Sequence, residues 1–326
     1  MKAKNLLEEF NYTPSGLGPR DLEVKITHCG ICHSDVHLID DDWGISAYPL
    51  VPGHEIVGTV TALGAEAGNF QIGQRVGIGW QRSACLTCEY CVRGEENLCP
   101  DNTATCVGHF GGFAESIRTD SRFVFPIPGE LASENAAPLL CGGITVFSPL
   151  VHCAGHGPLR VGILGIGGLG HLAIQFARAL GHRVTAFSTS PGKEKEALDL
   201  GAHHFIVTGG PAVFRGLASS FDLLLTTSPA DLDWKVYLDL LRPGGKLCFV
   251  GVPSKPAVIP VFALIAGKKS VCGSPIGSRT DMSAMLSFAA LNGIKAKTEV
   301  FAMSQVNEAL DRVRHNRARY RIVLKN

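Results

Sequence analysis

The chain has 326 residues, of which 45% are hydrophobic and 18% are charged, and 30 Lys and Arg against 29 Asp and Glu give it a formal net charge of +1. This balance argues against nucleic acid or an anionic membrane as the main partner, because both favour a strongly basic surface. The hydrophobic content excludes intrinsic disorder, and the length favours two domains.

The apolar stretches are too short for a membrane span. One of the longest, residues 257–266, falls well below the roughly 18 apolar residues that indicate a membrane helix. Near the start of the chain, Glu8 and Glu9 stand where a secretory signal needs an uninterrupted apolar segment. We therefore expect a cytoplasmic protein in which no helix crosses a bilayer.

The first 140 residues are rich in glycine and proline and contain short β-like runs at 22–26, 56–60 and 75–78. This pattern predicts a compact, mostly β domain with long loops.

From about residue 159 the pattern changes to short apolar strands that alternate with helical segments. The predicted strands are 161–164, 184–187, 205–207, 221–226 and 246–250, and the predicted helices are 169–180, 193–200 and 232–241, with a turn at 242–245. Such alternation indicates βαβ units and a parallel sheet. The last 50 residues predict helices at 282–291 and 306–314 and a final strand at 320–324.

Eleven cysteines are unusual for such a chain, and four of them lie close together at Cys85, Cys88, Cys91 and Cys99. Four thiolates at this spacing can surround one tetrahedral Zn²⁺ and leave no position for water, which is typical of a structural site. Four unrelated thiols on a loop would fit this spacing poorly.

A second set of metal-ligating residues is dispersed, at Cys32, His54 and Cys141. Each is a weak signal alone, because a lone cysteine is usually a small buried hydrophobe and a lone histidine usually has a structural role. Together they would leave the fourth zinc position open, as a Lewis-acid catalyst requires. Cys29 and Cys32 could instead form a two-cysteine knuckle, and the spacing leaves this open.

Two carboxylates, Asp35 and Glu55, neighbour these candidate ligands in sequence. They could accept hydrogen bonds from the ligands or bind the metal transiently, or they could be ordinary loop carboxylates.

A glycine-rich segment follows the apolar strand 161–164 and opens the next helix; its residues are Gly165, Gly167, Gly168, Leu169 and Gly170. In this G-x-G-x-x-G pattern the first glycine permits a tight turn, the second lets a pyrophosphate approach, and the third packs helix on strand. The helix N-terminus then attracts the phosphate charge. A glycine-rich turn without a ligand is the alternative.

The end of the next strand carries no Asp or Glu to bind the ribose 2′-hydroxyl of NAD. It carries Ser188, Thr189, Ser190 and Lys193 instead. Three hydroxyls and a cation suit a 2′-phosphate, so we predict NADP(H). Alternatively, the serines only cap the following helix and the cofactor is NAD.

These motifs, at residues 30–35, 51–58, 137–145 and 165–171, resemble the zinc-dependent medium-chain alcohol dehydrogenases, within them the cinnamyl alcohol dehydrogenase-like branch with its bacterial NADP-dependent aldehyde reductases. The resemblance implies an α/β protein with a GroES-like, mostly β catalytic domain and a doubly wound parallel-sheet (Rossmann) cofactor domain. The catalytic domain would comprise residues 1–142 and 276–326, and the cofactor domain residues 143–275. Residues 1–11 look too short for the strand hairpin with which the family usually opens.

The resemblance also implies roles for individual residues. Cys32, His54 and Cys141 would bind the catalytic zinc, with Cys29 outside the site; Ser34 would exchange a proton with the substrate and His37 would relay it to solvent. Asp35 and Glu55 would support the ligands, and Trp43 and Trp80 would line the substrate pocket. The implied cofactor-binding residues are His33, Thr145, the glycine-rich segment, Val252 and Arg321.

The sequence thus predicts a zinc- and NADP(H)-dependent aldehyde reductase or primary alcohol dehydrogenase with two zinc ions per subunit. We expect a homodimer, because residues 258–276 are apolar with β character where the family joins two cofactor domains. The remaining cysteines, Cys29, Cys106, Cys153, Cys248 and Cys272, are interpreted as ordinary thiols.

An NAD-dependent polyol or secondary alcohol dehydrogenase is one alternative function. A more distant one is a zinc-stabilised nucleic-acid-binding or regulatory protein that uses the nucleotide only as a sensor, supported by the arginine run from Arg312 to Arg321.

Overall fold

The computed structural model describes residues 6–153 and 157–326, and its contacts divide the chain into two units. The first comprises Met1–Ile144 and Gly277–Asn326, and the second comprises Thr145–Ile276. Residues 1–11 were expected to be too short for the opening hairpin, and the first five of them lie outside the described residues. Residues 7–18 carry no regular secondary structure.

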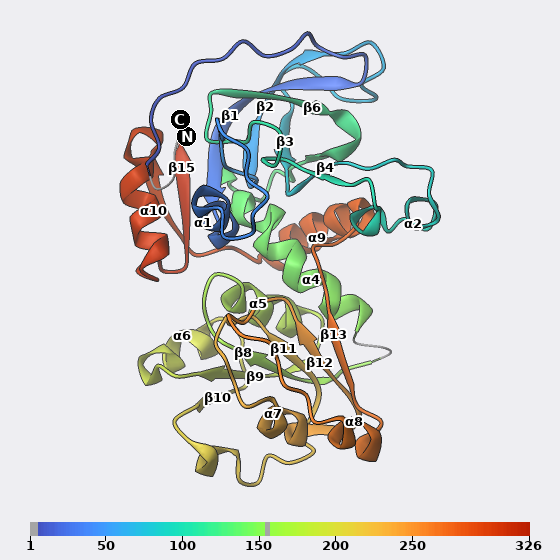
Figure 1. The fold of residues 1–326 in the computed structure, drawn as a ribbon, viewed down its shortest axis with the longest axis vertical. Coiled ribbons are helices and arrows are strands. Elements are labelled where there is room, and N and C mark those ends of the chain that lie inside the picture. The colour runs from blue at the N-terminus through green and yellow to red at the C-terminus, as the bar shows by residue number, and fades with distance from the viewer. Residues whose placement is uncertain (1–5, 154–156) are drawn as a thin grey trace. The chain divides into compact units, whose positions relative to one another are not determined.

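The first unit is built on a mostly antiparallel sheet with the strand order β14-β15-β1-β2-β3-β7, and β6 also pairs with β1 (Figure 1). Its strands are β1 (Asp21–Ile31), β2 (Ile56–Leu63), β3 (Arg75–Ile78), β6 (Ser116–Asp120), β7 (Val124–Pro126), β14 (Thr298–Ala302) and β15 (Arg321–Lys325). The parallel pair β14 and β15 comes from the C-terminal segment, which therefore completes the sheet that the N-terminal segment begins.

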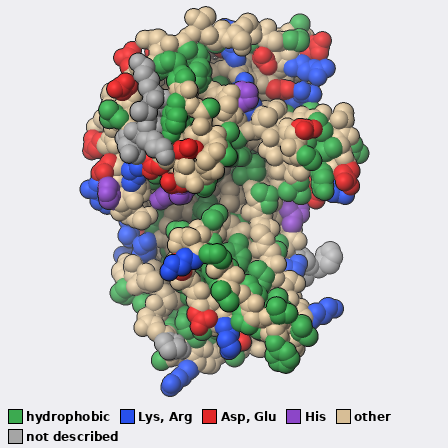
Figure 2. Space-filling model, in the orientation of Figure 1, with side chains coloured by type: hydrophobic (Ala, Val, Ile, Leu, Met, Phe, Trp, Pro, Cys, Tyr) green, Lys and Arg blue, Asp and Glu red, His purple; other side chains and the backbone are tan. Residues whose placement is uncertain are grey.

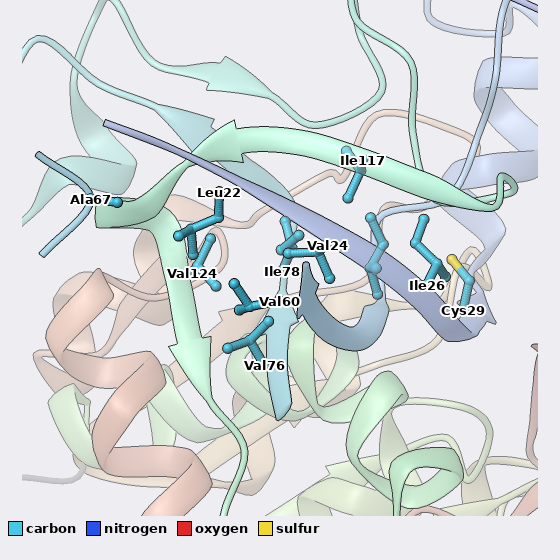
Figure 3. Packing of buried hydrophobic residues seen from close by; sticks show 11 residues of the cluster. Leu22, Val24, Ile26, Cys29, Val60, Ala67, Val76, Ile78, Ile117 and Val124 are labelled. Carbon is cyan, nitrogen blue, oxygen red and sulfur yellow. The ribbon is translucent and has the colours of Figure 1, made fainter. Parts of the chain in front are cut away.

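Alternating side chains of β1 form the core of this sheet. Leu22, Val24 and Ile26 are at most 1% exposed, because successive residues of a strand point to opposite faces. They pack with Val60 of β2 and Val76 of β3 (Figure 3).

Helices of the first unit complete its core at the other end of the sheet. The helices α1 (His33–Asp40) and α10 (Val306–Arg314) pack against each other and against β15. The other α-helices and strands of this unit are α2 (Glu89–Val92), α3 (Ser133–Ala136), α9 (Arg279–Asn292), β4 (Gln81–Ser83) and β5 (Thr103–Ala104). Because β1 leads directly into α1, residues 32–37 are held rigidly at the end of a buried strand.

The second unit is a parallel sheet with the strand order β10-β9-β8-β11-β12-β13. Its strands are β8 (Arg160–Leu164), β9 (Arg183–Ser188), β10 (His204–Val207), β11 (Phe221–Thr226), β12 (Leu241–Phe249) and β13 (Ser270–Gly273). Its helices are α5 (Gly170–Ala179), α6 (Glu194–Asp199), α7 (Trp234–Leu240) and α8 (Val261–Gly267), and α4 (Gly142–His152) enters from the first unit. In a sheet of this order, ligands bind at the carboxyl ends of the strands, where the strand order reverses beside β8. The predicted doubly wound fold is confirmed.

Two local predictions in this unit are wrong. The expected turn at 242–245 lies inside β12, which bulges there because Phe221 pairs with Leu241 but Leu223 pairs with Lys246. Where β structure was expected at 258–276, residues 261–267 form the helix α8, which ends where Lys268 adopts a left-handed backbone with φ of 49°. Only β13 is a strand there. Across the described ranges, no helix is long and apolar enough to cross a membrane.

Candidate metal centres and cofactor site

The three dispersed ligands predicted from the sequence come together in the first unit. Cys32 precedes the first turn of α1, His54 lies in the loop before β2, and Cys141 follows the short 3₁₀ helix Ala137–Leu140. The Sγ atoms of Cys32 and Cys141 are 3.9 Å apart. The ligand atoms of these residues and of Glu55 all lie within 4.8 Å of one another. Two thiols and an imidazole thus share one buried position.

Asp35 orients two of these ligands. Its Oδ1 is 3.0 Å from Nδ1 of the fully buried His54 and accepts the backbone N–H of Gly53 at 2.9 Å, while its Oδ2 accepts the N–H of Cys32 at 2.9 Å. Asp35 thus occupies Nδ1 of His54, whereas the second ring nitrogen, Nε2, is buried and has no hydrogen-bond partner among the described residues. A buried ring nitrogen left unpaired beside two thiols fits a metal ligand. The residues therefore fit a zinc ion with three protein ligands and one open position.

The thiol of Cys32 and the carboxyl group of Glu55 have pKa values that are shifted in opposite directions. Cys141 hydrogen-bonds to Cys32 and holds the pKa of the Cys32 thiol well below its usual range. Burial raises the pKa of Glu55 to about 7, although Arg321 opposes this shift. Arg321 forms an ion pair with Oε1 of Glu55, and both side chains are buried. Within the described part of the chain, Oε2 of Glu55 has no hydrogen-bond partner.

The side chain of Glu55 can take this position only because residue 30 is a glycine. A Cβ at position 30 would lie 2.0 Å from Oε2 of Glu55. The two-cysteine knuckle is not formed: Cys29 is buried in the sheet core and belongs to none of the metal-competent groups in the described ranges.

Of the predicted relay and pocket residues, Ser34 and Trp80 neighbour the ligands directly, and His37 and Trp43 follow behind Trp80. The Oγ of Ser34 is 3.6 Å from the Sγ of Cys32, and Nδ1 of His37 is 2.7 Å from a carboxylate oxygen of Asp42. The ring of Trp80 stands perpendicular to that of His54 at a centroid distance of 4.9 Å. Trp43 lies 5.1 Å from His37 and 6.3 Å from Trp80, between ring centroids. The two tryptophans thus form an aromatic wall beside the cluster.

The four closely spaced cysteines gather into a second cluster, held between β4 and β5 and around α2. The ligand sulfurs of Cys85, Cys88, Cys91 and Cys99 all lie within 4.8 Å of one another. The Sγ of Cys85 is 3.9 Å from that of Cys91 and 3.5 Å from that of Cys99. Backbone N–H groups of Thr87 and Cys88 lower the pKa of Cys85 to about 6. Four sulfurs at this separation fit a closed, structural zinc site.

The glycine-rich segment forms the turn between β8 and α5 in the second unit. Gly165 has φ of +95°, which favours glycine, and a Cβ on Gly170 would lie 2.0 Å from the carbonyl oxygen of Gly165. In contrast, a Cβ on Gly167 would meet nothing within 4 Å. Backbone conformation and packing therefore explain why residues 165 and 170 are glycines. Gly167 instead leaves open a space that a pyrophosphate would fill.

The residues predicted to bind the 2′-phosphate lie beside this turn. The Nζ of Lys193 donates to the carbonyl oxygen of Ile166 at 2.6 Å, which brings the cation to the glycine-rich turn. Thr189 and Ser190 are exposed at the end of β9. Ser188 is 7% exposed, and its Oγ accepts the N–H of Ser190 at 3.1 Å. This hydroxyl therefore stabilises the turn after β9.

The other predicted cofactor residues belong partly to the first unit and partly to the second. Val252 is 78% exposed just after β12, at the carboxyl edge of the parallel sheet, whereas Thr145 is buried on α4. His33 is exposed on α1 in the first unit. Arg321 is 5% exposed and is paired with Glu55 rather than presented at a surface.

Sequence reasoning missed two neighbours of the site. The thiol of Cys106 lies within 4.8 Å of ligand atoms of His54 and Asp35, and Asp42 fixes the ring of His37. Neither belongs to a motif, so the sequence carried no signal for them. It also treated Cys153, Cys248 and Cys272 as separate thiols, whereas their sulfurs come together in the second unit.

The C-terminal arginine run does not form a free basic surface. Arg312 pairs with Glu299, Arg314 with Asp40 and Arg317 with Asp311. These ion pairs remove the main support for a nucleic-acid-binding role.

Comparison with known proteins indicates a dehydrogenase. Residues 18–129 match the alcohol dehydrogenase GroES-like domain, and residues 168–290 match the zinc-binding dehydrogenase domain. The chain is 43% identical over 326 residues to the aldehyde reductase AdhA of Synechocystis sp., which covers 100% of this chain and 97% of that relative. A cinnamyl alcohol dehydrogenase of Sorghum bicolor, SbCAD4, superposes with a TM-score of 0.94 at 40% identity, covering 99% of this chain and 96% of that one. A cinnamyl alcohol dehydrogenase of Helicobacter pylori, complexed with NADP(H), superposes with a TM-score of 0.90 at 32% identity, covering 100% and 96%.

Proposed function

Because the chain belongs to the zinc-dependent medium-chain alcohol dehydrogenases, in their cinnamyl alcohol dehydrogenase-like branch, we propose that it reduces aldehydes with NADPH and, in reverse, oxidises primary alcohols. The observation that carries the proposal is the unpaired, buried Nε2 of His54 beside the thiols of Cys32 and Cys141. The aldehyde reductase of Synechocystis sp. and the NADP(H) complex of the Helicobacter pylori relative support it.

In this proposal the chain's own residues hold the reacting groups. Cys32, His54 and Cys141 hold a zinc ion, and Asp35 fixes the ring of His54 so that Nε2 is the ligand. When bound, the zinc polarises the substrate carbonyl as a Lewis acid and NADPH supplies the hydride. The two tryptophans, Trp43 and Trp80, exclude water from the substrate side of the cluster.

Ser34 handles the proton. Its hydroxyl, next to Cys32, donates a proton to the substrate oxygen as the carbonyl is reduced, and it is reprotonated from solvent through His37. Asp42 holds Nδ1 of His37 and so leaves the other ring nitrogen for proton exchange. The second zinc, held by the four cysteines from Cys85 to Cys99, has a structural role only, because its coordination is closed.

The central experiment measures NADPH oxidation with a panel of aldehydes, together with zinc content. We expect two zinc ions per chain in the wild type. Cys32→Ser and Cys141→Ser should each lose one zinc and all measurable turnover while they keep the wild-type circular dichroism spectrum. Cys153→Ser, a thiol outside this cluster, is the matched control and should keep full activity. Unimpaired turnover in both ligand variants would exclude the proposed site.

We also propose that Lys193 makes the enzyme prefer NADP(H). The side chain of Lys193 lies at the glycine-rich turn, and no carboxylate follows β9 to bind an unphosphorylated ribose. Losing a charge-assisted hydrogen bond costs about 1.5–3 kcal/mol, which corresponds to roughly a 10- to 150-fold weaker affinity.

Lys193→Ala should therefore raise the dissociation constant of NADPH by about this factor and leave that of NADH almost unchanged. Lys195→Ala, an exposed lysine on the following helix, is the control and should bind both cofactors like the wild type. Fluorescence titration with NADPH and NADH measures both constants. Equal or better use of NADH by the wild type would favour the NAD-dependent alternative.

For the assembly we propose a homodimer formed through α8 and the terminal strand β13. The support is the apolar, exposed surface of α8 beside an open sheet edge.

A further inference from the structure

Three cysteines of the second unit, outside both clusters described above, converge on one point. Cys153 follows the last residue of α4, Cys248 lies on β12 and Cys272 lies on β13. Their sulfurs all lie within 4.8 Å of one another, and none of them is in a disulfide. They belong to segments that are distant in sequence, so only the fold brings them together.

The strand register explains two of the three positions. Cys248 and Cys272 are direct partners in the parallel ladder between β12 and β13, and partners in neighbouring strands point to the same face of a sheet. The end of α4 then brings Cys153 to the same place, where its sulfur lies within 4.8 Å of those of both strand cysteines.

The surroundings are unlike those of thiols that serve only as small hydrophobes. Cys248 is fully buried, but Cys153 and Cys272 are partly exposed, so an ion can reach the cluster from solvent. Nζ of Lys246 donates to the carbonyl oxygen of Cys153 at 3.2 Å and brings a positive charge close to the sulfurs. A nearby cation stabilises thiolates, which are the form that binds metals.

The sulfur separations suit a single metal ion. Thiolates bind Zn²⁺ at about 2.3 Å, which places two sulfurs of one ion about 4 Å apart. A disulfide would use only two of the three thiols and would leave the third without a role.

We propose that Cys153, Cys248 and Cys272 form a further metal site that binds one thiophilic ion, Cu(I) or Zn²⁺, through three thiolates. Three thiolates complete a trigonal Cu(I) site, whereas Zn²⁺ also takes a water molecule. Binding exchanges thiol protons for the metal and involves no change of oxidation state. The bound ion links the end of α4 to β12 and β13. The proposal does not depend on the reaction that the enzyme catalyses.

The test uses the full-length, zinc-loaded protein, reduced and kept under anaerobic conditions. Cu(I) is added in competition with a colorimetric Cu(I) chelator, while a zinc-sensitive dye reports any zinc that is released. In a second arm, the protein is dialysed against Zn²⁺ and its metal content is measured. The variants are Cys153→Ser and Cys272→Ser, both at partly exposed positions, and the control is Ser270→Ala on the same strand.

We expect wild type and Ser270→Ala to take up one ion per chain beyond the zinc they contain, without releasing zinc. Both cysteine variants should lose this additional equivalent and keep their original zinc and the wild-type melting temperature. The arm that shows uptake identifies the ion. The proposal is overturned if neither arm shows an additional ion, if both cysteine variants still bind it, if the first Cu(I) displaces zinc, or if the thiols are lost to a disulfide without metal uptake.

Discussion

At the scale of single residues, Asp35 decides the geometry of the candidate catalytic centre. Its side chain is fully buried and accepts three hydrogen bonds, from the backbone of Cys32, the backbone of Gly53 and the ring of His54. Both of its oxygens therefore serve as acceptors, and an amide nitrogen in either place would face another donor. The position thus requires a carboxylate although Asp35 itself does not have to touch the metal.

Asp35→Asn should accordingly weaken zinc binding at this site by about 10- to 100-fold, the usual effect of removing a group that orients a metal ligand. Zinc retention against increasing concentrations of a chelator measures the effect, and the four-cysteine cluster in the same chain is an internal reference. Asp101→Asn changes an exposed carboxylate and should retain zinc like the wild type. If Asp35→Asn retained both zinc ions as firmly as the wild type, Asp35 would have no role in positioning His54.

Single residues also show how far the sequence could predict the candidate site. The spacing of Cys85 to Cys99 predicts a shared site, because short separations along the chain force proximity. Cys32, His54 and Cys141 are far apart in sequence, and only a family resemblance grouped them. The contact of Cys106 with His54 and the grouping of Cys153 with Cys248 were beyond prediction, since they depend on strand register and on where a helix ends.

At the scale of elements, α9 holds the four-cysteine loop against the rest of the first unit. Arg279, the first residue of α9, donates from Nε and Nη2 to Oε1 of Glu96 at 3.0 and 2.7 Å. The side chain of Glu96 is 3% exposed and lies three residues before Cys99. The helix start is itself fixed by a capping box between Ser278 and Asp281.

Arg279→Ala should lower the free energy of unfolding by about 1.5–3 kcal/mol, because it leaves the buried carboxylate of Glu96 without its charged donor. Arg93→Ala removes an exposed ion pair of the same loop, with Glu89 and Glu95, and should cost no more than about 1 kcal/mol. Urea denaturation of both variants gives the comparison. Equal destabilisation would mean that burial of Glu96 does not matter.

Helices and strands could be predicted from the sequence where burial of one face sets the spacing of the apolar residues. The apolar residues of 306–314 recur at helical spacing because one face of α10 packs on α1 and β15, and the prediction of this helix is confirmed. The β structure expected at 258–276 was wrong because only part of the apolar pattern there reflects a core. Leu264 packs on the core of the second unit, whereas Val261, Phe262 and Ile265 are exposed. The turn expected at 242–245 failed for another reason, since a bulge accommodates Pro243 and glycines within one strand.

At the scale of the whole molecule, the surface around α8 has features of an interface. Among the described residues, β13 is the last strand of its sheet, so one of its edges is open. Hydrophobic side chains gather over α8, at the lower right of Figure 2. Val258, Val261, Phe262 and Ile265 are 79%, 64%, 79% and 71% exposed. Contiguous apolar surface of this kind indicates a binding partner, and a second copy of the chain is the partner that we propose.

The wild type should therefore sediment as a dimer, and the double variant Phe262→Glu, Ile265→Lys should sediment as a monomer, because burying two charges in an apolar interface is unfavourable. Leu291→Glu, at an 86% exposed position on α9, is the control and should remain dimeric. Sedimentation velocity over a range of concentrations measures the change, and circular dichroism checks that the fold is kept. Neither substituted side chain contributes to a buried core cluster in the described structure, so loss of the dimer without loss of the fold is the expected result. A monomeric wild type, or a double variant that stays dimeric, would show that this surface has another role.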